Sequence, residues 1–361
     1  MRFPLRVATV YKRDVYRRFA PAKMSTIRWL RMSEGLAASG HRVDMIMNGN
    51  SIAHSNPNLR SVPFGQVDWN SYDVIKTLFH SGFESLWEEG GGSHPFIISK
   101  LGSVVGKHDD TEGVYFFNHE REHLYSIQER IHDCSRYVTL LTEASRRLWV
   151  ELFGNNDNLL HIPTGVDREL PASRDNPYKR FRDPIAIYAG NIYGKSQPEM
   201  NVVWQDRLNR VGRLLRKKRI RLCFIGTGRT DRLDRSAVTV MREVDNSDFW
   251  DFQRFADVGL VLAQGQAQHN ESSKLYYYLR TGLPVVSESP VPNNFLIEET
   301  GMGHVADYGD DRMLADMVES AIDKEWPRRE AIQYVVRHHC WEQRVEIYDE
   351  VIRAGLMAES A

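Results

Sequence analysis

The sequence predicts an α/β protein of two successive domains, each built on a mainly parallel sheet covered on both faces. Short apolar runs typical of buried strands alternate with helical patterns in both halves of the chain. A charged, proline-bearing segment without periodicity, residues 171–184, separates the halves. The length of 361 residues also exceeds what one ordinary core fills.

The first half predicts strands from its apolar runs and helices from its capping residues. Gly40 and His41 form a stop after the first helix, and Thr142 is an N-cap residue before the last one. The expected strands are 6–11, 42–47, 73–79, 95–99, 137–141 and 159–163. The expected helices are 25–39, 120–133 and the stretch from Thr142 to the glycine-asparagine stop at 154–156.

The second half repeats this alternation after the linker. Its expected strands are 185–189, 221–225, 258–262 and 284–287. Its expected helices are 201–218, a short helix that starts at the Ser-Ser-Lys triplet 272–274, 313–321 and 341–354. We therefore expect a first domain at 1–168, a linker at 169–184, a second domain at 185–340 and a terminal helix at 341–361 that can cross back to the first domain.

Composition excludes several classes of protein. The chain has 47 basic and 48 acidic residues, and such a balance argues against a nucleic-acid binder. Its three cysteines are odd in number and far apart, which fits a reducing compartment better than a disulfide framework. Residues 1–6 lack a signal peptide's apolar core, and no apolar run is long enough to span a membrane. We expect a cytoplasmic protein.

The segment 270–286 carries the most specific chemical signal. Ser272 and Ser273 stand where an N-cap is expected, and Lys274 adds a positive charge to the amide-rich start of the helix. Gly282 ends the helix and Pro284 prevents its continuation. Because lysine is disfavoured at a helix N-terminus, a bound anion such as a phosphate would explain it. An ordinary surface lysine at a helix start is the alternative.

Two further strand ends in the second half carry permissive residues. Gly190 and Asn191 follow one strand, and Gly226, Thr227 and Gly228 follow the next. Ligands of open parallel sheets bind at the carboxyl ends of strands, where glycines let backbone amides approach a pyrophosphate. Each glycine can also be part of a routine turn. A nicotinamide fingerprint is disfavoured because its third glycine position is Asp231.

The order and spacing of these segments resemble GT-B glycosyltransferases. The closer resemblance is to the large nucleotide-sugar-dependent branch that builds bacterial glycans, the family 4-like enzymes. The segments that carry it are 187–191, 224–228, 255–261 and 273–286 in the second half, and 40–43 and 161–167 in the first. The last of these is similar to the Pro-Asn-Gly-Val-Asp segment that leads out of the first domain in that branch.

This resemblance implies two Rossmann-like domains facing across a cleft, with a nucleotide-sugar donor in the second and an acceptor facing the first. It also implies that no metal or other cofactor is needed. Lys274 matches the family lysine that contacts the donor diphosphate, and Ser272 and Ser273 would donate beside it. Gly190 matches the glycine at the first strand's end. Asn191 stands where an arginine is common, and Lys195 matches the lysine that follows.

One departure concerns the two glutamates that the family often carries eight positions apart. The corresponding residues here are His269 and Tyr277. Glu271 or Glu243 can replace the missing ribose carboxylate, and Tyr277 is itself a candidate contact to ribose or sugar. Some inverting GT-B enzymes, including the xanthan-type glucuronosyltransferase, keep the lysine but replace the second glutamate. The sequence therefore leaves retention and inversion open.

The first domain offers three candidates for a catalytic group. Many relatives have a histidine shortly after the strand at 95–99, where this sequence has Leu101. His108, Asp109 and His119 are the substitutes, and an inverting enzyme would use one of them as general base toward the acceptor hydroxyl. Solvated loop residues are the alternative for each. Residues 102–106 can also pass close to the donor diphosphate.

Basic residues interleaved with aromatics follow the first strand. They are Lys12, Arg13, Arg17, Arg18, Lys23, Arg28 and Arg31, near Tyr11, Phe19, Trp29 and Leu30. Such a face can rest peripherally on an anionic membrane or hold a phosphate-bearing acceptor. A solvated helix face above core aromatics is the alternative.

The function that these features predict is sugar transfer from a UDP- or GDP-linked donor to a glycan, a lipid-linked glycan or a small molecule. A GT-B-type nucleotide-sugar epimerase would use the same donor site without an acceptor. A non-catalytic nucleotide-sugar-binding protein would account for the missing glutamates. The sugar, the nucleotide base and the acceptor are not readable from the sequence, because a few loop contacts decide them.

Overall fold

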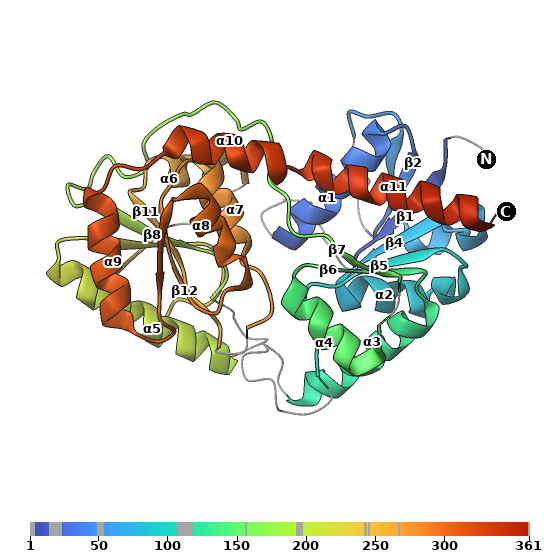
Figure 1. Cartoon of the computed structure of the whole chain (residues 1–361), viewed down its shortest axis with the longest axis horizontal. Helices are drawn as coiled ribbons and strands as arrows, with labels where there is room; N and C mark the ends of the chain where they lie inside the picture. Colours follow the sequence, from blue (N-terminus) through green and yellow to red (C-terminus); the bar gives the residue numbers. More distant parts are fainter. Residues whose placement is uncertain are drawn as a thin grey trace. The chain divides into compact units, whose positions relative to one another are not determined.

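The computed structural model contains two compact units that the chain enters more than once (Figure 1). It describes residues 4–13, 24–48, 54–106, 118–155, 157–192, 198–241, 244, 246–265 and 268–359. The first unit comprises residues 1–165, 269–271 and 340–361. The second unit comprises residues 166–268 and 272–339. Each unit is an α/β structure on a parallel sheet, as the alternation of strands and helices predicts.

The first unit is built on a seven-stranded sheet in the order β3-β2-β1-β4-β5-β6-β7. Every neighbouring pair is parallel. The strands are β1 (Arg6–Val10), β2 (Arg42–Ile46), β3 (Leu59–Val62), β4 (Val74–Leu78), β5 (Ile97–Lys100), β6 (Tyr137–Leu140) and β7 (Leu159–His161). Strands β1, β4 and β5 are buried almost throughout, because helices cover both faces of a parallel sheet.

Five helices form the two outer layers of this unit in the part of the chain described. They are α1 (Met24–Ala38), α2 (Phe79–Glu88), α3 (Asn118–Cys134), α4 (Glu143–Phe153) and α11 (Trp341–Glu359). One apolar cluster joins the sheet to α1 and α11 through side chains such as Leu36 and Tyr348. A second cluster joins the other face to α2, α3 and α4 through Phe83, Ile131 and Trp149.

The C-terminal helix α11 is part of the first unit although the second unit precedes it in the sequence. Gly35 of α1 gives it room, since a Cβ there would lie 2.2 Å from a methyl carbon of Val345. A buried polar contact also holds it, because Nε2 of His41 lies 2.7 Å from Oδ1 of Asp349. The helix therefore completes the layer that α1 begins.

The second unit has a six-stranded parallel sheet in the order β10-β9-β8-β11-β12-β13. Its strands are β8 (Ile185–Ala189), β9 (Arg221–Ile225), β10 (Val238–Val240), β11 (Val258–Val261), β12 (Val285–Glu288) and β13 (Gly303–Ala306). Its helices are α5 (Pro198–Lys217), α6 (Asn246–Arg254), α7 (Ser273–Arg280), α8 (Phe295–Thr300), α9 (Asp311–Asp323) and α10 (Arg328–His338). Helices α5 and α9 share one apolar cluster with the sheet.

Helix α7 packs closely on the second sheet through Tyr278. A Cβ on Gly259 of β11 would lie 2.4 Å from the Tyr278 ring, so only glycine admits this approach. The Tyr278 hydroxyl also accepts a 3.0 Å hydrogen bond from the amide of Ala189 at the end of β8. These contacts hold α7 against β11 and the carboxyl end of β8.

The predicted strands and helices are confirmed with boundaries shifted by a few residues, and several short elements are additional. Strands β3, β10 and β13 and helices α2, α6, α8 and α10 were not expected. In one case a strand was drawn too long, because the apolar run at 73–79 continues from β4 into α2. Phe79 begins that helix with φ at 61°.

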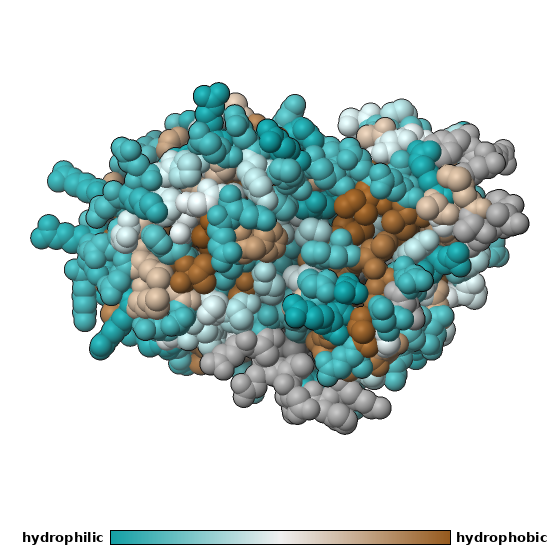
Figure 2. All heavy atoms as spheres, viewed as in Figure 1, coloured by the Kyte–Doolittle hydropathy of each residue, from teal (hydrophilic) through white to brown (hydrophobic). Residues whose placement is uncertain are grey.

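The surface is mainly polar, and no helix in the described ranges is both long and apolar enough to cross a bilayer. Figure 2 shows hydrophilic side chains over most of the displayed face, in keeping with a charged-residue content of 26%.

Candidate functional site

The start of α7 is held by a side chain that the sequence did not point to. The Asn293 amide contacts the Ser272 backbone twice: its Oδ1 accepts from Ser272 N at 2.8 Å, and its Nδ2 donates to Ser272 O at 2.9 Å. Ser272 occupies the N-cap position, but its hydroxyl makes no capping bond, so this part of the prediction is wrong. The buried Ser272 Oγ has no hydrogen-bond partner within the described residues.

Lys274 lies one residue inside the helix with its side chain turned to the end of β8. Its Nζ is 5.1 Å from the centre of the Tyr188 ring. A Cβ on Gly190 would lie 2.8 Å from the Lys274 Cε, so the lysine runs along bare backbone. No hydrogen bond or ion pair joins this ammonium to any described residue. Burial without a counter-charge lowers the pKa of Lys274 to about 8.

The glycine-rich strand ends pack backbone against backbone beside the lysine. Gly190 and Gly226 have φ angles of 152° and 148°, in a region that only glycine adopts readily. A Cβ on Gly226 would lie 1.9 Å from the Gly190 carbonyl oxygen. Gly228 has φ at 117°. The hydroxyl of Thr227 donates to Asn191 Oδ1 at 3.3 Å and links the two loops.

These groups together present hydrogen-bond donors of the kind that an anion accepts from. The first amides of a helix lack partners within the helix, and the helix dipole favours negative charge there. The Ser272 hydroxyl and the Lys274 ammonium add two donors that have no partner among the described residues, and the glycines leave the backbone open to close approach. A phosphate group would supply acceptors for all of them.

The other residues predicted to contact the donor differ in their burial and packing. Ser273 is the first residue of α7 and is half-buried. Tyr277 is buried at 2% exposure, and its ring stacks on Trp250 with the centres 4.9 Å apart. Its packing role is clear, and its contact with ribose stays a prediction. Lys195 and Glu243 lie outside the described residues.

Glu271 belongs to the first unit with His269 and Asn270. Its carboxylate accepts a 2.7 Å hydrogen bond from the Thr164 amide and another from the Thr164 hydroxyl. The side chain is only 2% exposed. Both bonds are accepted by Oε1, and the contact of Glu271 with ribose stays a prediction.

His269, at the first missing glutamate position, anchors the same segment. Its carbonyl accepts from the hydroxyls of Thr142 and Ser145 at 2.5 and 3.1 Å, at the start of α4. Its imidazole Nε2 accepts from the Val104 amide at 3.3 Å. Residues 269–271 are therefore attached to the first unit by backbone and side-chain bonds.

The predicted catalytic candidates of the first unit cannot be placed. His108 and Asp109 lie outside the described residues, as does the side chain of His119. Residues 101–106 just before them are well held, because the Gln128 amide donates to Val105 O at 2.8 Å and accepts from Val105 N at 2.7 Å. Leu101 is fully buried.

The basic N-terminal face is only partly described, and one of its members is internal. Arg28 is 5% exposed and donates to the Thr164 hydroxyl at 2.5 Å. Trp29 is in the core, while Arg31 pairs with Glu34 at 2.9 Å on the surface. Arg17, Arg18, Phe19 and Lys23 lie outside the described residues. Arg28 therefore does not contribute to a surface patch.

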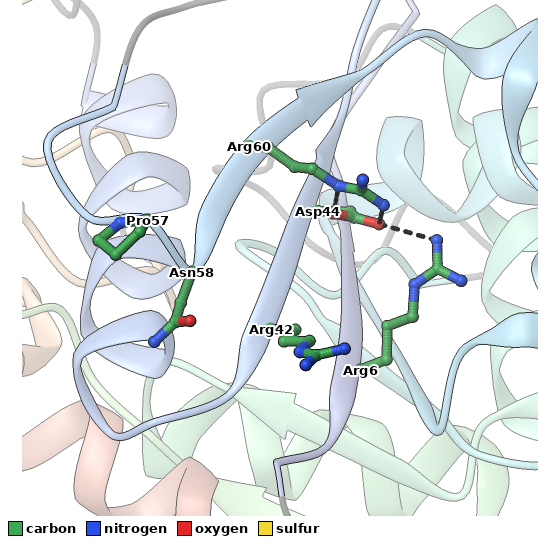
Figure 3. Close-up of a pocket in the computed structure, with 6 residues that line it drawn as sticks. All are labelled: Arg6, Arg42, Asp44, Pro57, Asn58 and Arg60. Carbon is green, nitrogen blue, oxygen red and sulfur yellow. Dashed lines mark hydrogen bonds and ion pairs between the residues drawn. The ribbon is translucent and has the colours of Figure 1, made fainter.

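A charged hollow of about 350 Å³ lies at the amino end of the first sheet, and it differs from the site at Lys274 because two of its basic residues pair with a carboxylate (Figure 3). Asp44 of β2 accepts from Arg60 at 2.5 and 3.0 Å, from Arg6 at 3.2 Å and from the Tyr72 hydroxyl at 2.7 Å. Burial opposes ionisation of Asp44, but these hydrogen bonds outweigh it, so its pKa lies below its usual value. Arg6 and Arg60 are thus compensated within the fold.

Sequence reasoning overlooked three polar residues that the structure makes prominent. Asn293 holds Ser272, and its only signal is an asparagine pair after Pro292. Lys76 and Lys100 lie in the buried strands β4 and β5, at 4% and 2% exposure. A lysine inside an otherwise apolar run was the signal that could have found them, because lysine is almost never fully buried without a partner.

Comparison with known proteins identifies the fold. No protein-family model matches the sequence, and no curated protein does. Sucrose-phosphate synthase from Thermosynechococcus elongatus is similar in structure, with a TM-score of 0.75 over 98% of this chain and 100% of that chain, at 14% identity. WaaG, a glycosyltransferase involved in lipopolysaccharide biosynthesis, has a TM-score of 0.66 at 14% identity, covering 96% and 99%.

A third similar structure is HepE from Anabaena, solved in complex with UDP-glucose. Its TM-score is 0.70 at 11% identity, covering 97% of this chain and 100% of that chain. The chain therefore has the GT-B fold of glycosyltransferases, as the motif order predicts. At these identities the likeness defines the fold, and the chemistry must be argued from the site.

Proposed function

We propose that this protein is a glycosyltransferase that takes a sugar from a UDP- or GDP-linked donor, whose diphosphate binds at the start of α7. The observation that carries the proposal is the half-buried ammonium of Lys274, which has no counter-charge in the described structure and lies along Gly190. HepE, which has the same fold, is solved with UDP-glucose, and that supports a nucleotide sugar as the ligand.

The same groups would assist the transfer step. When the glycosidic bond of the donor breaks, negative charge develops on the departing diphosphate. Lys274, the α7 amides and the Ser272 hydroxyl would stabilise that charge more strongly than the charge of the intact donor. A fixed cation and helix amides can do this without a metal, so we propose a metal-independent reaction.

The acceptor is assigned to the first unit. A general base toward its hydroxyl must come within hydrogen-bond reach, and His108, Asp109 and His119 remain the proposed candidates. Glycans, lipid-linked glycans and small molecules all remain in the class of acceptors.

Nucleotide binding and turnover test this proposal in two stages. We expect UDP or GDP to raise the melting temperature more than uridine or guanosine at equal concentration, because only the nucleotides carry the diphosphate. Mass spectrometry of a panel of UDP and GDP sugars should then show slow donor hydrolysis for the matching donor. If neither nucleotide exceeds its nucleoside, the diphosphate site is wrong. If one binds but no sugar is released or transferred, the enzymatic assignment is wrong.

A further inference from the structure

The first unit contains a group of buried cations, which we call the cation cluster. Its members are Arg28 of α1, Lys76 of β4, Lys100 of β5 and Arg344 of α11. None is more than 6% exposed. Lysine and arginine are almost never buried without a counter-charge, because the desolvation of an unpaired ion is very costly.

The four cations lie on one face of the first sheet. Lys76 is in register with Ile98, and Lys100 follows two residues later on β5, so both lysines project from the same face. Tyr348 of α11 covers this face, with the Lys76 Nζ 4.5 Å from the centre of its ring. Lys100 is the last residue of β5, which places the cluster toward the carboxyl edge where ligands of parallel sheets bind.

The two lysines of the cluster lie mainly among like charges in the described structure. Arg28, Lys76 and Arg344 all repel the Lys100 ammonium, and Glu271 attracts it. Burial first, and then this repulsion, lower the pKa of Lys100 well below its usual value. Burial and the charge of Arg28 lower the pKa of Lys76 to about 7. Of the charged groups that act on the two lysines in the described structure, Glu271 is the one that attracts, and it acts on Lys100.

The two arginines and the two lysines differ in how their donors are used. Arg28 donates to the Thr164 hydroxyl, and Arg344 Nε donates to the Thr164 carbonyl at 3.3 Å. Lys100 donates once, to the Ile162 carbonyl at 2.6 Å. Lys76 makes no hydrogen bond or ion pair with the described part of the chain. The arginines hold the segment around Thr164, and the lysines keep donors available.

An aromatic wall adjoins the cluster at the end of β4. The Phe79 and Tyr11 rings meet edge to face with their centres 6.0 Å apart, and the Arg28 guanidinium carbon lies 5.5 Å from the Phe79 ring centre. Phe79 is half-buried and has φ at 61°, which an aromatic residue rarely adopts. Backbone strain of this kind concentrates at ligand sites.

We propose that Lys76 and Lys100 bind the oxyanion of an acidic sugar acceptor, a phosphate or a carboxylate, whose ring packs toward Phe79 and Tyr11. This inference rests on the proposed glycosyltransferase function and adds the chemical class of its acceptor. The oxyanion accepts hydrogen bonds from the ammonium groups and adds negative charge beside Lys76, whose described electrostatic neighbour is the cationic Arg28. The charge-assisted bonds give the site its preference over neutral sugars.

The test is calorimetric titration of the full chain, saturated with UDP to occupy the donor site. Glucose 6-phosphate, glucuronate and glucose are compared in the wild type, Lys76→Met and Lys324→Met. Lys324→Met is a matched control, because that exposed lysine also lies over an aromatic ring, 4.1 Å from the centre of Trp326. We expect Lys76→Met to weaken binding of the acidic sugars by about 10- to 100-fold, and Lys324→Met to leave it unchanged.

Each outcome has a defined meaning. Tighter binding of glucose 6-phosphate identifies a phosphate acceptor, and tighter binding of glucuronate identifies a carboxylate acceptor. The proposal is overturned if neither acidic sugar binds the wild type more tightly than glucose does, or if Lys76→Met binds them as the wild type does. Failure of UDP to bind would instead contradict the donor site. The sugar titrations are then carried out without UDP, and they still test the acceptor site.

A second measurement needs no substitution and stands if Lys76→Met does not fold. An oxyanion favours the charged form of Lys76 and raises its pKa, so glucuronate binding at pH 7.5 should take up protons. Titrations in two buffers with different ionisation enthalpies report that uptake directly. Binding without proton uptake would contradict contact with Lys76.

Discussion

The two units hold their buried positive charge in different ways. In the second unit a single ammonium, that of Lys274, lies along glycine backbone beside the start of a helix, with no carboxylate bonded to it in the described structure. In the first unit Lys100 lies among the like charges of Arg28, Lys76 and Arg344 and is attracted by Glu271. In our proposal the charge of Lys274 is compensated by the donor diphosphate, whereas the charge of Lys100 is already compensated in part by Glu271.

The hollow around Asp44 shows what a compensated cation site looks like in the same chain. There Arg6, Arg60 and a tyrosine donate to one carboxylate, so these two arginines have their counter-charge in the fold, while Arg42 of the same hollow is exposed to solvent (Figure 3). The comparison teaches that the number of unused donors, rather than the number of basic residues, separates a binding site from a structural ion-pair network.

The largest effect is expected from removing the one carboxylate of the cation cluster. Glu271→Gln keeps the shape of the side chain but leaves the buried cations without their partner. Breaking a buried pair in this way costs about 3–5 kcal/mol of the free energy of unfolding. Urea denaturation measures the change, with the exposed Glu298→Gln as the control. A loss of unfolding free energy below about 1 kcal/mol, the range of surface pairs, would show that the buried cations do not all carry their charge at the same time.

The glycine contact of the second unit can be tested by Gly226→Ala. The added methyl would collide with the Gly190 carbonyl, and the backbone angle is unfavourable for alanine, so we expect a loss of about 1–3 kcal/mol or more. UDP affinity should fall with it. Gly40→Ala is the control, because Gly40 has φ at 93° but open space around it. Equal losses of stability in Gly226→Ala and Gly40→Ala would show that close packing at Gly226 is not the cause.

The charge imbalance of the first unit predicts a specific pH dependence. Because the pKa of Lys76 is lowered in the folded state, burying this lysine costs stability at all pH values below its unfolded pKa. That cost is full below about pH 7 and falls by about 1.4 kcal/mol per pH unit as the pH rises toward 10.5. Lys76→Met should therefore be more stable than the wild type at pH 7, with an advantage that shrinks by pH 9. Denaturation at several pH values, in buffers free of oxyanions, would show a constant difference if Lys76 is not the group involved.

A smaller pH effect is expected at the donor site. Diphosphate binding should raise the lowered pKa of Lys274, so the complex takes up a proton at and above about pH 8. UDP affinity should then fall by up to about tenfold from pH 7 to pH 9. Calorimetry in paired buffers checks the proton count. Affinity that stays constant over this range would place the diphosphate away from the lysine.

The sequence points to the groups around α7 but not to the cation cluster, for a physical reason. The groups around α7 are contiguous or follow strand ends, and strand ends of one sheet meet at one edge. The predicted Ser272 capping bond is absent, and the residue that does bond the Ser272 backbone, Asn293, is 21 residues away in the sequence. The cation cluster comes from α1, β4, β5, α11 and the loop at Glu271, and no local pattern joins elements so far apart.

The fold itself was predictable because the alternation of apolar strand runs with helical patterns, and the glycines that end the helices, can be read from short stretches of sequence. The elements that escaped were short or continuous with a neighbour, as where β4 runs into α2 through Phe79. Tyr277 shows the limit of motif reasoning, since its position matches a family ligand while its ring stacks on Trp250 in the interior.

The most direct test of the central claim is the UDP affinity of Lys274→Met, measured by calorimetry beside Lys76→Met. Loss of one charged hydrogen bond should weaken UDP binding by about 1.5–3 kcal/mol in Lys274→Met, while Lys76→Met binds UDP as the wild type does. Unchanged UDP and GDP affinity in Lys274→Met, with the variant folded, would contradict the diphosphate site and the sugar transfer built on it.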